Sequence, residues 1–194
     1  MTQLSTSRLL LREWRESDLV PFAELNAEPE VMRYFPAALD QAQSDEFAAR
    51  VRATLAKQGW GLWAAEVPGI APFIGFVGLN QVRFQAHFTP AIEVGWRLDR
   101  HFWGYGYATE AARTALEFAF DRLDSEQIVS FTTAGNERSR RVMRRLGMTH
   151  DPSDDFDHPA VPEGPLRRHV LYRMSNEFWR VAASHGANLS AQNA

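Results

Sequence analysis

The residues best suited to chemistry are two glycines, Gly104 and Gly106, which stand between a predicted strand and a predicted helix. The first turn of a helix has backbone N–H groups without intrahelical partners, and the helix dipole adds partial positive charge there. A phosphate is stabilised at such an end, and glycine lets a ligand approach the backbone closely. Ala108 is nearly as small, and Thr109 adds a hydroxyl donor. The pattern indicates an anion-binding turn.

This turn matches neither of two common phosphate-binding motifs. No Gly-Lys-Ser/Thr follows it, which excludes the phosphate loop of nucleoside triphosphatases. The third glycine of the dinucleotide-binding fingerprint is missing, and the preceding strand lies in the middle of the chain. Two glycines before a helix are weak evidence by themselves, so the neighbouring elements must be considered.

The turn is held between a strand expected at residues 90–98 and a helix that runs to about Leu123. The helix carries apolar residues at helical spacing, which predicts one face packed on a sheet; they are Ala108, Ala112, Ala115, Leu116, Ala119 and Leu123. A strand at 127–133 follows. Strand, helix and strand in this order predict a crossover unit with two neighbouring parallel strands.

A second helix is expected after that unit, from the N-cap residue Asn136 to the stop at Gly147. Ser139 lies on its apolar face with Val142, Met143 and Leu146, and a hydroxyl there must find a partner. The residues alone favour a simple cap for Asn136 and a small core residue for Ser139. Arg138, Arg141 and Arg145 share another face of the same helix.

The glycine-bearing stretch resembles a known family. Gly-Tyr-Gly-Tyr-Ala-Thr-Glu-Ala at 104–111, after Glu-Val-Gly-Trp-Arg-Leu at 93–98, resembles the acyl-CoA-binding loop of the GNAT acetyltransferases. Arg8-Leu9-Leu10-Leu11-Arg12 and the segment 31–36 are similar to the branch that contains the ribosomal-protein N-terminal acetyltransferases. The family pattern is Arg/Gln-x-x-Gly-x-Gly/Ala, and this chain has Trp103, Gly106 and Ala108 at those positions, so Trp103 departs from the pattern. The resemblance covers about 7–174.

The resemblance implies acetyl-CoA as co-substrate, held without a metal ion. Carried onto this chain, the implied contacts are Trp96, Arg97, Leu98, Trp103, Gly104, Tyr105, Gly106, Tyr107, Ala108, Thr109, Asn136 and Arg140. Asn136 would contact the pantetheine arm, Arg140 the phosphates, and Ser139 would lie near the thioester sulfur. With the resemblance, these roles outweigh the cap and core interpretations.

The implied reaction is direct acetyl transfer to an amine. A backbone N–H near Leu98 would polarise the thioester carbonyl, and Gly95 would help that strand to distort locally. Glu93 is the one carboxylate in the strand and is a candidate base; a rim carboxylate facing solvent explains it equally well. Ser139 is the candidate donor to the leaving thiolate, because no Tyr occurs between 136 and 148.

Composition excludes several other classes of protein. The chain of 194 residues has no cysteine, which removes disulfides and thiol catalysis, and its net charge of -3 argues against general nucleic-acid binding. No apolar run is long enough to span a membrane, and no signal peptide is evident. A reducing cytoplasm is the expected compartment. His150, His158 and His169 match no zinc motif.

The expected fold is α/β in the α+β sense: a mixed, mostly antiparallel sheet of about six to seven strands with helices on both faces. Its parallel pair is expected to splay at the acyl-CoA site. A single acetyltransferase domain is expected over 1–194, with a core at about 7–174, a closing helix at 176–184 and a frayed tail at 186–194. Tyr34, Phe35 and Phe47 are expected to pack in the core rather than to contact substrate.

The sequence therefore predicts an acetyl-CoA-dependent N-acetyltransferase acting on a primary amine, either a protein or peptide N-terminus or a small molecule. A non-catalytic acyl-CoA sensor and an aminoglycoside-type acetyltransferase are the alternatives. The acidic loop 151–157 would suit a polycation, although a solvated loop explains it better. The acceptor and the oligomeric state stay open, since members of this branch can form homodimers.

Overall fold

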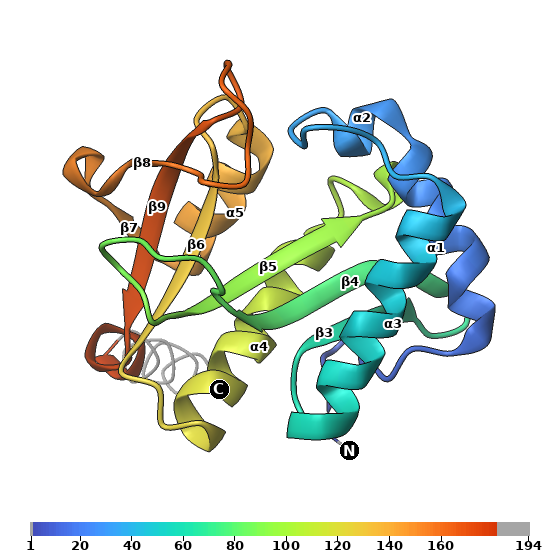
Figure 1. Ribbon diagram of the computed structural model, residues 1–194. Helices are drawn as coiled ribbons and strands as arrows, with labels where there is room; N and C mark the ends of the chain where they lie inside the picture. The colour runs from blue at the N-terminus through green and yellow to red at the C-terminus, as the bar shows by residue number, and fades with distance from the viewer. Residues whose placement is uncertain (1, 182–194) are drawn as a thin grey trace.

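The computed structural model describes residues 2–181, and its centre is one twisted sheet (Figure 1). The predicted tail and the end of the closing helix lie outside the described residues. The strands are β1 (Leu4–Ser5), β2 (Leu10–Arg12), β3 (Leu62–Val67), β4 (Ala71–Gln81), β5 (Ile92–Leu98), β6 (Gln127–Thr133), β7 (Thr149–His150), β8 (Phe156–Asp157) and β9 (Arg168–Ser175).

The helices are α1 (Leu19–Ala27), α2 (Pro29–Met32), α3 (Gln41–Gln58), α4 (Tyr107–Arg122) and α5 (Glu137–Leu146), and a further helix begins at residue 176. Short 3₁₀ turns occur at Glu16–Asp18, Arg100–Phe102 and Pro152–Asp154. Asp40 caps α3 through the amide of Gln43, and Gly147 ends α5 in the left-handed conformation. No helix within residues 2–181 is both long and apolar enough to cross a bilayer.

The sheet is mostly antiparallel and contains one parallel pair, as predicted. Its order is β1-β2-β3-β4-β5-β6-β9-β7, with β8 paired to β9. Residues 2–181 form nine strands rather than six or seven, because β1, β7 and β8 are two-residue strands too short to give a sequence pattern. The parallel pair is β5 with β6, joined by α4.

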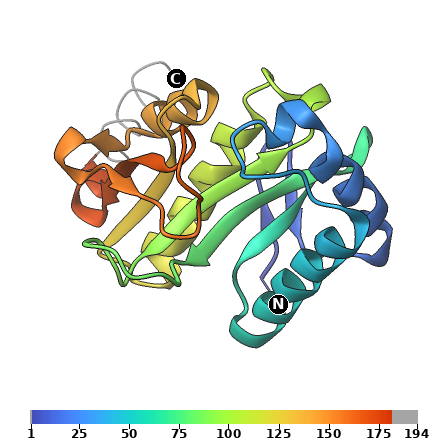
Figure 2. The same cartoon turned by 45° about the horizontal axis from the view of Figure 1, so that its top comes forward.

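Helices cover both faces of the sheet. The helices α1 and α3 pack on the face of β3 and β4, whereas α4 packs on the other face against β4, β5 and α5 (Figure 1). Figure 2, with the top turned forward, shows β6 and β9 separated from the half that carries α1–α3. The sheet therefore has two halves that meet at β5 and β6.

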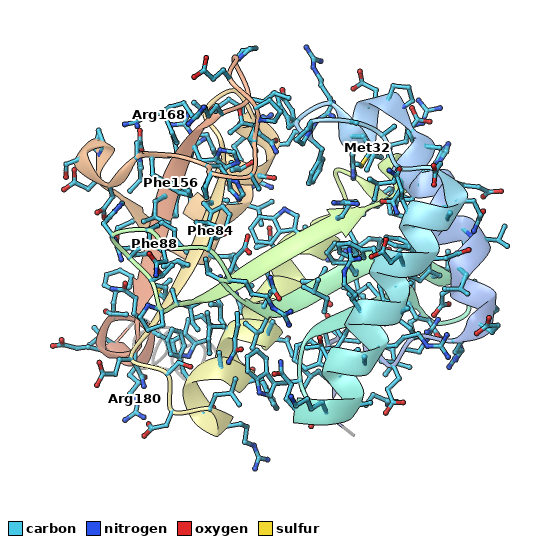
Figure 3. All side chains as sticks on the ribbon, in the orientation of Figure 1. Met32, Phe84, Phe88, Phe156, Arg168 and Arg180 are labelled. Atoms are coloured by element: carbon cyan, nitrogen blue, oxygen red, sulfur yellow. The ribbon has the colours of Figure 1, made fainter. Side chains whose placement is uncertain are left out.

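The sheet is packed against two hydrophobic cores. The larger core fills the space between the sheet and its helices and includes Trp63, Phe22 and Phe120, all fully buried. The smaller core covers β6 and β9 and centres on Phe88 and Phe156, with Phe84 beside them (Figure 3). The larger core continues onto one face of β6 and β9 through Ile128, Val170 and Met174, whereas the aromatic cluster covers Val129 and Leu171 on the other face of the same two strands.

Two predicted segments differ from the structure. The apolar residues 6–12 predict one strand, but only Leu10–Arg12 form β2, because the chain turns at Thr6, whose N–H donates to Leu9 O at 2.9 Å. The Pro-rich segment 151–165 predicts a loop, but it contains β8, which pairs with β9. A local turn in the first segment and a pairing of two-residue length in the second leave no periodicity in the sequence.

Candidate active site

The site begins where the parallel pair of strands ends. β5 and β6 pair only at Ile92 with Ile128 and at Glu93 with Val129. Beyond these residues the two strands diverge (Figure 1). β5 stays in unbroken register with β4 as far as Leu98, so the strand departs from β6 in the region of Gly95 without a bulge in the β4–β5 ladder. The divergence leaves one backbone edge of β5 without a neighbouring strand.

Alternation along β5 decides which amides face the gap. Asp99 N–H donates to Ile74 O at 2.9 Å, so odd-numbered residues of β5 direct their backbone groups toward β4. Even-numbered residues direct theirs toward β6. Trp96 and Leu98 lie beyond the last residue pair shared with β6, and their N–H groups point into the gap. These two amides are donors available to a ligand.

The predicted anion-binding turn follows directly after β5. Gly104 and Gly106 have φ of 84° and 83°, a region that other residues rarely adopt. Gly106 is the N-cap of α4, so no side chain caps the amides of the first helical turn. Its carbonyl accepts from Glu110 N at 3.0 Å and starts the helix. The uncapped turn leaves N–H groups and positive potential for an anion.

The turn between β1 and β2 holds this helix end in position. The Glu110 carboxylate accepts from the hydroxyl of Thr6 at 2.5 Å and from Nε of Arg8 at 2.7 Å. Nη1 of Arg8 also donates to Tyr105 O at 3.0 Å. Burial alone would raise the pKa of Glu110, but the hydrogen bonds from Thr6, Arg8 and Ser7 outweigh it and lower the pKa. Glu110 therefore acts as an anchor for the first turn of α4.

One cavity of about 730 Å³ joins the helix end to the open edge of β5. Its volume lies in the range of small-molecule sites. The predicted site residues that line it are Glu93, Trp96, Arg97, Leu98, Trp103, Gly104, Gly106, Tyr107, Ala108, Thr109, Asn136 and Ser139. The structure thus brings together residues from β5, α4 and α5. Within residues 2–181, no group of three or more acidic or His side chains could hold a metal ion.

Two residues predicted to bind the cofactor do not line this cavity. Tyr105 is 61% exposed and stacks on the ring of Tyr107. Arg140 donates to Ala134 O at 3.1 Å and pairs with Glu137 at 2.8 Å. Neither side chain is directed to the cavity, so phosphate contacts by these two residues have no support in the geometry.

Three other arginines of α5 border the cavity, and we call Arg138, Arg141 and Arg145 the arginine rim. The guanidinium of Arg138 lies over the ring of Trp103, 4.3 Å from its centroid. Arg141 and Arg145 have no carboxylate partner among residues 2–181. The sequence showed that these three share a face, but it did not show that this face meets the helix end of α4.

Trp103 takes a structural role at the position where the family pattern has Arg or Gln. Its indole Nε1 donates to Leu98 O at 2.8 Å. This bond occupies the last carbonyl on the open edge of β5 and ties the turn to the strand. Arg138, whose guanidinium stacks on the indole, brings a positive charge next to this position.

Asn136 and Ser139 form a small network at the start of α5. Nδ2 of Asn136 donates to the hydroxyl oxygens of Thr132 at 3.0 Å and of Ser139 at 3.1 Å. Oδ1 of Asn136 accepts from Ser139 N at 3.3 Å, which is the predicted N-cap. The Ser139 hydroxyl is therefore an acceptor within this network, and its own proton is free to point into the cavity.

Glu93 lies on the floor of the cavity, opposite Asn80 of β4 in the sheet. The Glu93 side chain is half-buried. Its exposed part faces the cavity rather than bulk solvent, so protein surrounds the carboxylate. Burial raises the pKa of Glu93 to about 8. The carboxylate is thus a stronger base than an ordinary glutamate, and the alternative of a solvent-facing rim residue is disfavoured.

Arg97 lies four residues further along the same face of β5. It is 9% exposed, and its Nη1 donates to Asn26 Oδ1 at 2.5 Å. Nε is buried without a partner, and such an unsatisfied donor costs about 1–3 kcal/mol. Burial lowers the pKa of Arg97 to about 10, which leaves the group charged at neutral pH. The rings of Phe35, Phe47 and Phe76 lie 4.2–5.6 Å from its Cζ.

Two histidines also reach the cavity. The rings of His158 and His169 lie 4.9 Å apart. Burial lowers the pKa of both groups, and for His158 the neighbouring His169 adds to this effect. Both imidazoles are therefore neutral at pH 7. No sequence pattern predicts this position, because His158, which follows β8, and His169 of β9 meet only through the β8–β9 pairing.

The acidic loop 151–157 does not face the cavity. Two of its carboxylates pair with arginines, Asp154 with Arg173 and Asp157 with Arg168, and Asp155 contacts the ring of His150. These contacts hold the side chains against the protein and away from the cavity. The geometry gives no support to an aminoglycoside acceptor.

The raised pKa of Glu93 predicts a pH dependence of stability. The unfolded chain releases this proton near pH 4.5 and the folded chain near pH 8, so the folded state binds the extra proton between these values. The free energy of unfolding should then fall as pH rises from about 4.5 to about 8. Glu93→Gln should flatten this slope, measured by urea denaturation across that range. Glu24→Gln, on the exposed surface of α1, should leave it unchanged. Equal slopes in all three proteins would contradict the assignment.

Comparison with known proteins agrees with this geometry. The pattern of the family described as "Acetyltransferase (GNAT) domain" matches residues 8–149. YkkB of Bacillus subtilis, an uncharacterised protein, is 32% identical over 148 residues, which are 76% of this chain and 85% of YkkB. FsC-acetyl coenzyme A-N(2)-transacetylase of Aspergillus fumigatus is 30% identical over 189 residues, covering 91% of this chain and 77% of that enzyme.

The fold also matches a solved structure from the predicted branch. RimL, a ribosomal L7/L12 alpha-N-protein acetyltransferase in complex with coenzyme A, superposes with a TM-score of 0.70. The match covers 90% of this chain and 98% of RimL at 16% identity, which shows a shared fold. The splayed strands, the uncapped helix end and the match over most of the sequence agree: this chain is an N-acetyltransferase and belongs to the GNAT acetyltransferase family.

Proposed function

We propose that this N-acetyltransferase transfers the acetyl group of acetyl-CoA directly to a primary amine bound in the same cavity. The observation that supports this most strongly is the open edge of β5, whose Trp96 and Leu98 amides share one cavity with the uncapped end of α4. Acetyl-CoA carries an acyl group at one end and a diphosphate further along. The open edge of β5 suits the acyl end, and the uncapped end of α4 suits the diphosphate. The acceptor is a protein or peptide N-terminus or a small amine.

The diphosphate of acetyl-CoA binds at the first turn of α4. Backbone N–H groups of residues 107–109 donate to its oxygens, and Gly104 and Gly106 let the phosphates approach. The arginine rim adds positive charge beside the same turn. The pantetheine arm then lies along β5 as an additional strand, using the backbone groups that β6 leaves unpaired, with Asn136 on its other side.

The reaction needs little covalent chemistry from the protein. The amine nitrogen attacks the thioester carbonyl, and the oxyanion that forms accepts hydrogen bonds from the Trp96 and Leu98 amides. Glu93 accepts the proton that the amine loses, directly or through a water. The C–S bond then breaks, and the thiolate takes a proton from the Ser139 hydroxyl, which regains one through water in the cavity from the protonated Glu93, so that the amine proton ends on the sulfur of CoA. The products are an amide and free CoA.

An amine panel tests the proposal. Acetyl-CoA is incubated with the enzyme and peptides with free N-termini, polyamines, small amino compounds or aminoglycosides, and free thiol is measured. Thiol release that depends on a primary amine, with N-acetyl product identified by mass, is expected. Tight CoA binding without turnover on any amine would contradict the proposed reaction.

Gly106→Val should weaken CoA binding by tenfold or more, because a branched side chain at the helix end occupies the path of the phosphates. Calorimetric titration with CoA measures this. Gly69→Val is the matched control, because Gly69 also has a positive φ, of 76°, but lies in the β3–β4 turn outside the cavity. Backbone strain is then similar in the two variants. An equal loss of CoA affinity in both, or in neither, would argue against a phosphate site at Gly106.

Ser139→Ala should lower kcat about 100-fold while leaving the KM for acetyl-CoA nearly unchanged, since the hydroxyl acts on the leaving group. Steady-state thiol-release kinetics give both constants. Thr132→Val removes the other hydroxyl that Asn136 contacts and keeps Ser139 in place. Similar losses in the two variants would mean that the network only positions α5 and that Ser139 donates no proton.

A further inference from the structure

Arg97 is a buried charged residue whose guanidinium is only partly satisfied among the described residues. Its guanidinium has one acceptor within residues 2–181, Oδ1 of Asn26, and no carboxylate partner. Nε is buried with no partner, whereas Nη2, also without one, is not fully buried. These two nitrogens form one edge of the guanidinium fork, the edge that binds a carboxylate through two parallel hydrogen bonds.

The Arg97 side chain lies on the face of the sheet that α1 and α3 cover, which we call the acceptor face. The first turn of α4, where the phosphates are proposed to bind, lies on the opposite face. Along β5 side chains alternate, so Arg97 points to the same side as Glu93 and away from Trp96 and Leu98. Its neighbours there are Asn26 of α1 and the aromatic rings around its Cζ. The helix end of α4 packs on the opposite face. A phosphate of acetyl-CoA is therefore not the natural partner of Arg97.

Arg97 borders two cavities. It lines the site and also a second cavity of about 420 Å³ between α3 and α2, whose Met32 is labelled in Figure 3. The charged residues of the second cavity are Glu46, Arg50 and Arg97, and Arg50 already pairs with Glu46 at 2.6 Å. One positive charge is left over there, and it is that of Arg97. A monoanion would neutralise it.

We infer that the acceptor amine carries a carboxylate, which binds the free edge of Arg97 while the amine lies near Glu93. This rests on the proposed function and specifies its substrate class as a small amino carboxylate. Positions 93 and 97 are about 13 Å apart at Cα, from roughly 3.3 Å per strand residue. The Glu93 side chain leans toward Arg97, since its Oε1 lies 3.7 Å from the place that a Cβ of Gly95 would take, so the amine and the carboxylate of the acceptor are separated by a short chain of atoms.

A carboxylate fits the site better than a phosphate does. The pocket offers one guanidinium edge, and the rings of Phe35, Phe47 and Phe76 supply the rest of its surroundings. A phosphate dianion would keep one charge unmatched among apolar rings, and burying it would be costly. The planar carboxylate matches the planar fork and its single charge.

The test uses matched acceptors with the full-length enzyme. One series runs from glycine to 6-aminohexanoate, and each member is compared with its carboxamide and with the alkylamine of the same length. Thiol release with acetyl-CoA gives kcat and KM. Independently, stabilisation of the CoA-bound enzyme against heat by each compound reports binding without turnover.

Wild-type enzyme should prefer at least one amino carboxylate over its carboxamide by tenfold or more in KM. Arg97→Met should remove this preference while CoA affinity stays unchanged, and Arg97→Lys should retain part of it. Arg50→Met is the control, since Arg50 lines the second cavity but is already paired, and it should keep the preference. If Arg97→Met fails to fold, the wild-type comparison of carboxylates with carboxamides and the Arg97→Lys variant still test the inference.

Equal use of carboxylates and carboxamides by the wild type would overturn the inference while the proposed function stands. So would acetylation of acidic peptides with no activity on small amino carboxylates. Amino carboxylates could also stabilise the CoA complex without releasing thiol. If Arg97→Met abolished that stabilisation, the anion site would be supported, whereas the proposed reaction would be contradicted.

Discussion

The structure depends on how short the parallel pairing between β5 and β6 is. Two residue pairs join the strands; Glu93 belongs to the second, and the Trp96 and Leu98 amides and the anion-binding turn lie beyond it. Had the pairing continued, β6 would have used the Trp96 and Leu98 amides, and the cavity would be filled by strand. The divergence also explains the second hydrophobic core, because β6 and β9 share the larger core on one face only, and their other face lies away from α1 and α3 and is covered by the aromatic cluster. A binding site and a split core thus follow from one feature.

Charge in the cavity is divided between the two faces of the sheet. On the α4 face the helix end and the arginine rim create positive potential suited to phosphates. On the face of α1 and α3 the groups are Glu93, whose burial favours its neutral form, and Arg97, which burial leaves charged but unmatched. Buried Glu93 and buried Arg97 therefore both favour ligand binding. Glu93 gains a partner when an amine is bound, and Arg97 gains one when an anion is bound.

Much of the fold and the turn before α4 could be predicted from the sequence, because local patterns along the chain specify them. Gly104, Gly106 and the alanine stripe of α4 give a strand–turn–helix signal without tertiary information, and Asn136 with Gly147 gives the bounds of α5. The mixed sheet follows from the order of these elements.

Other features depend on contacts between distant segments. Arg140 and Arg138 are two residues apart, and only the angle of α5 against the turn decides that Arg138 faces the cavity. The anchoring of Glu110 by Thr6 and Arg8 joins residues about a hundred positions apart. The isolation of Arg97 appears only when its whole shell of neighbours is known, because an absent partner leaves no sequence pattern. Single residues of this kind require the structure.

The central claim is that the uncapped amides at the start of α4 bind the diphosphate of acetyl-CoA. Backbone amide resonances of Tyr107, Ala108 and Thr109 test it directly, followed by NMR during titration with CoA and, separately, with pantetheine, which lacks the diphosphate. CoA should shift these three resonances and slow exchange of their amide protons with solvent, whereas pantetheine should perturb β5 and leave them unchanged. Identical responses to both compounds, or no response to CoA at these amides, would contradict the account.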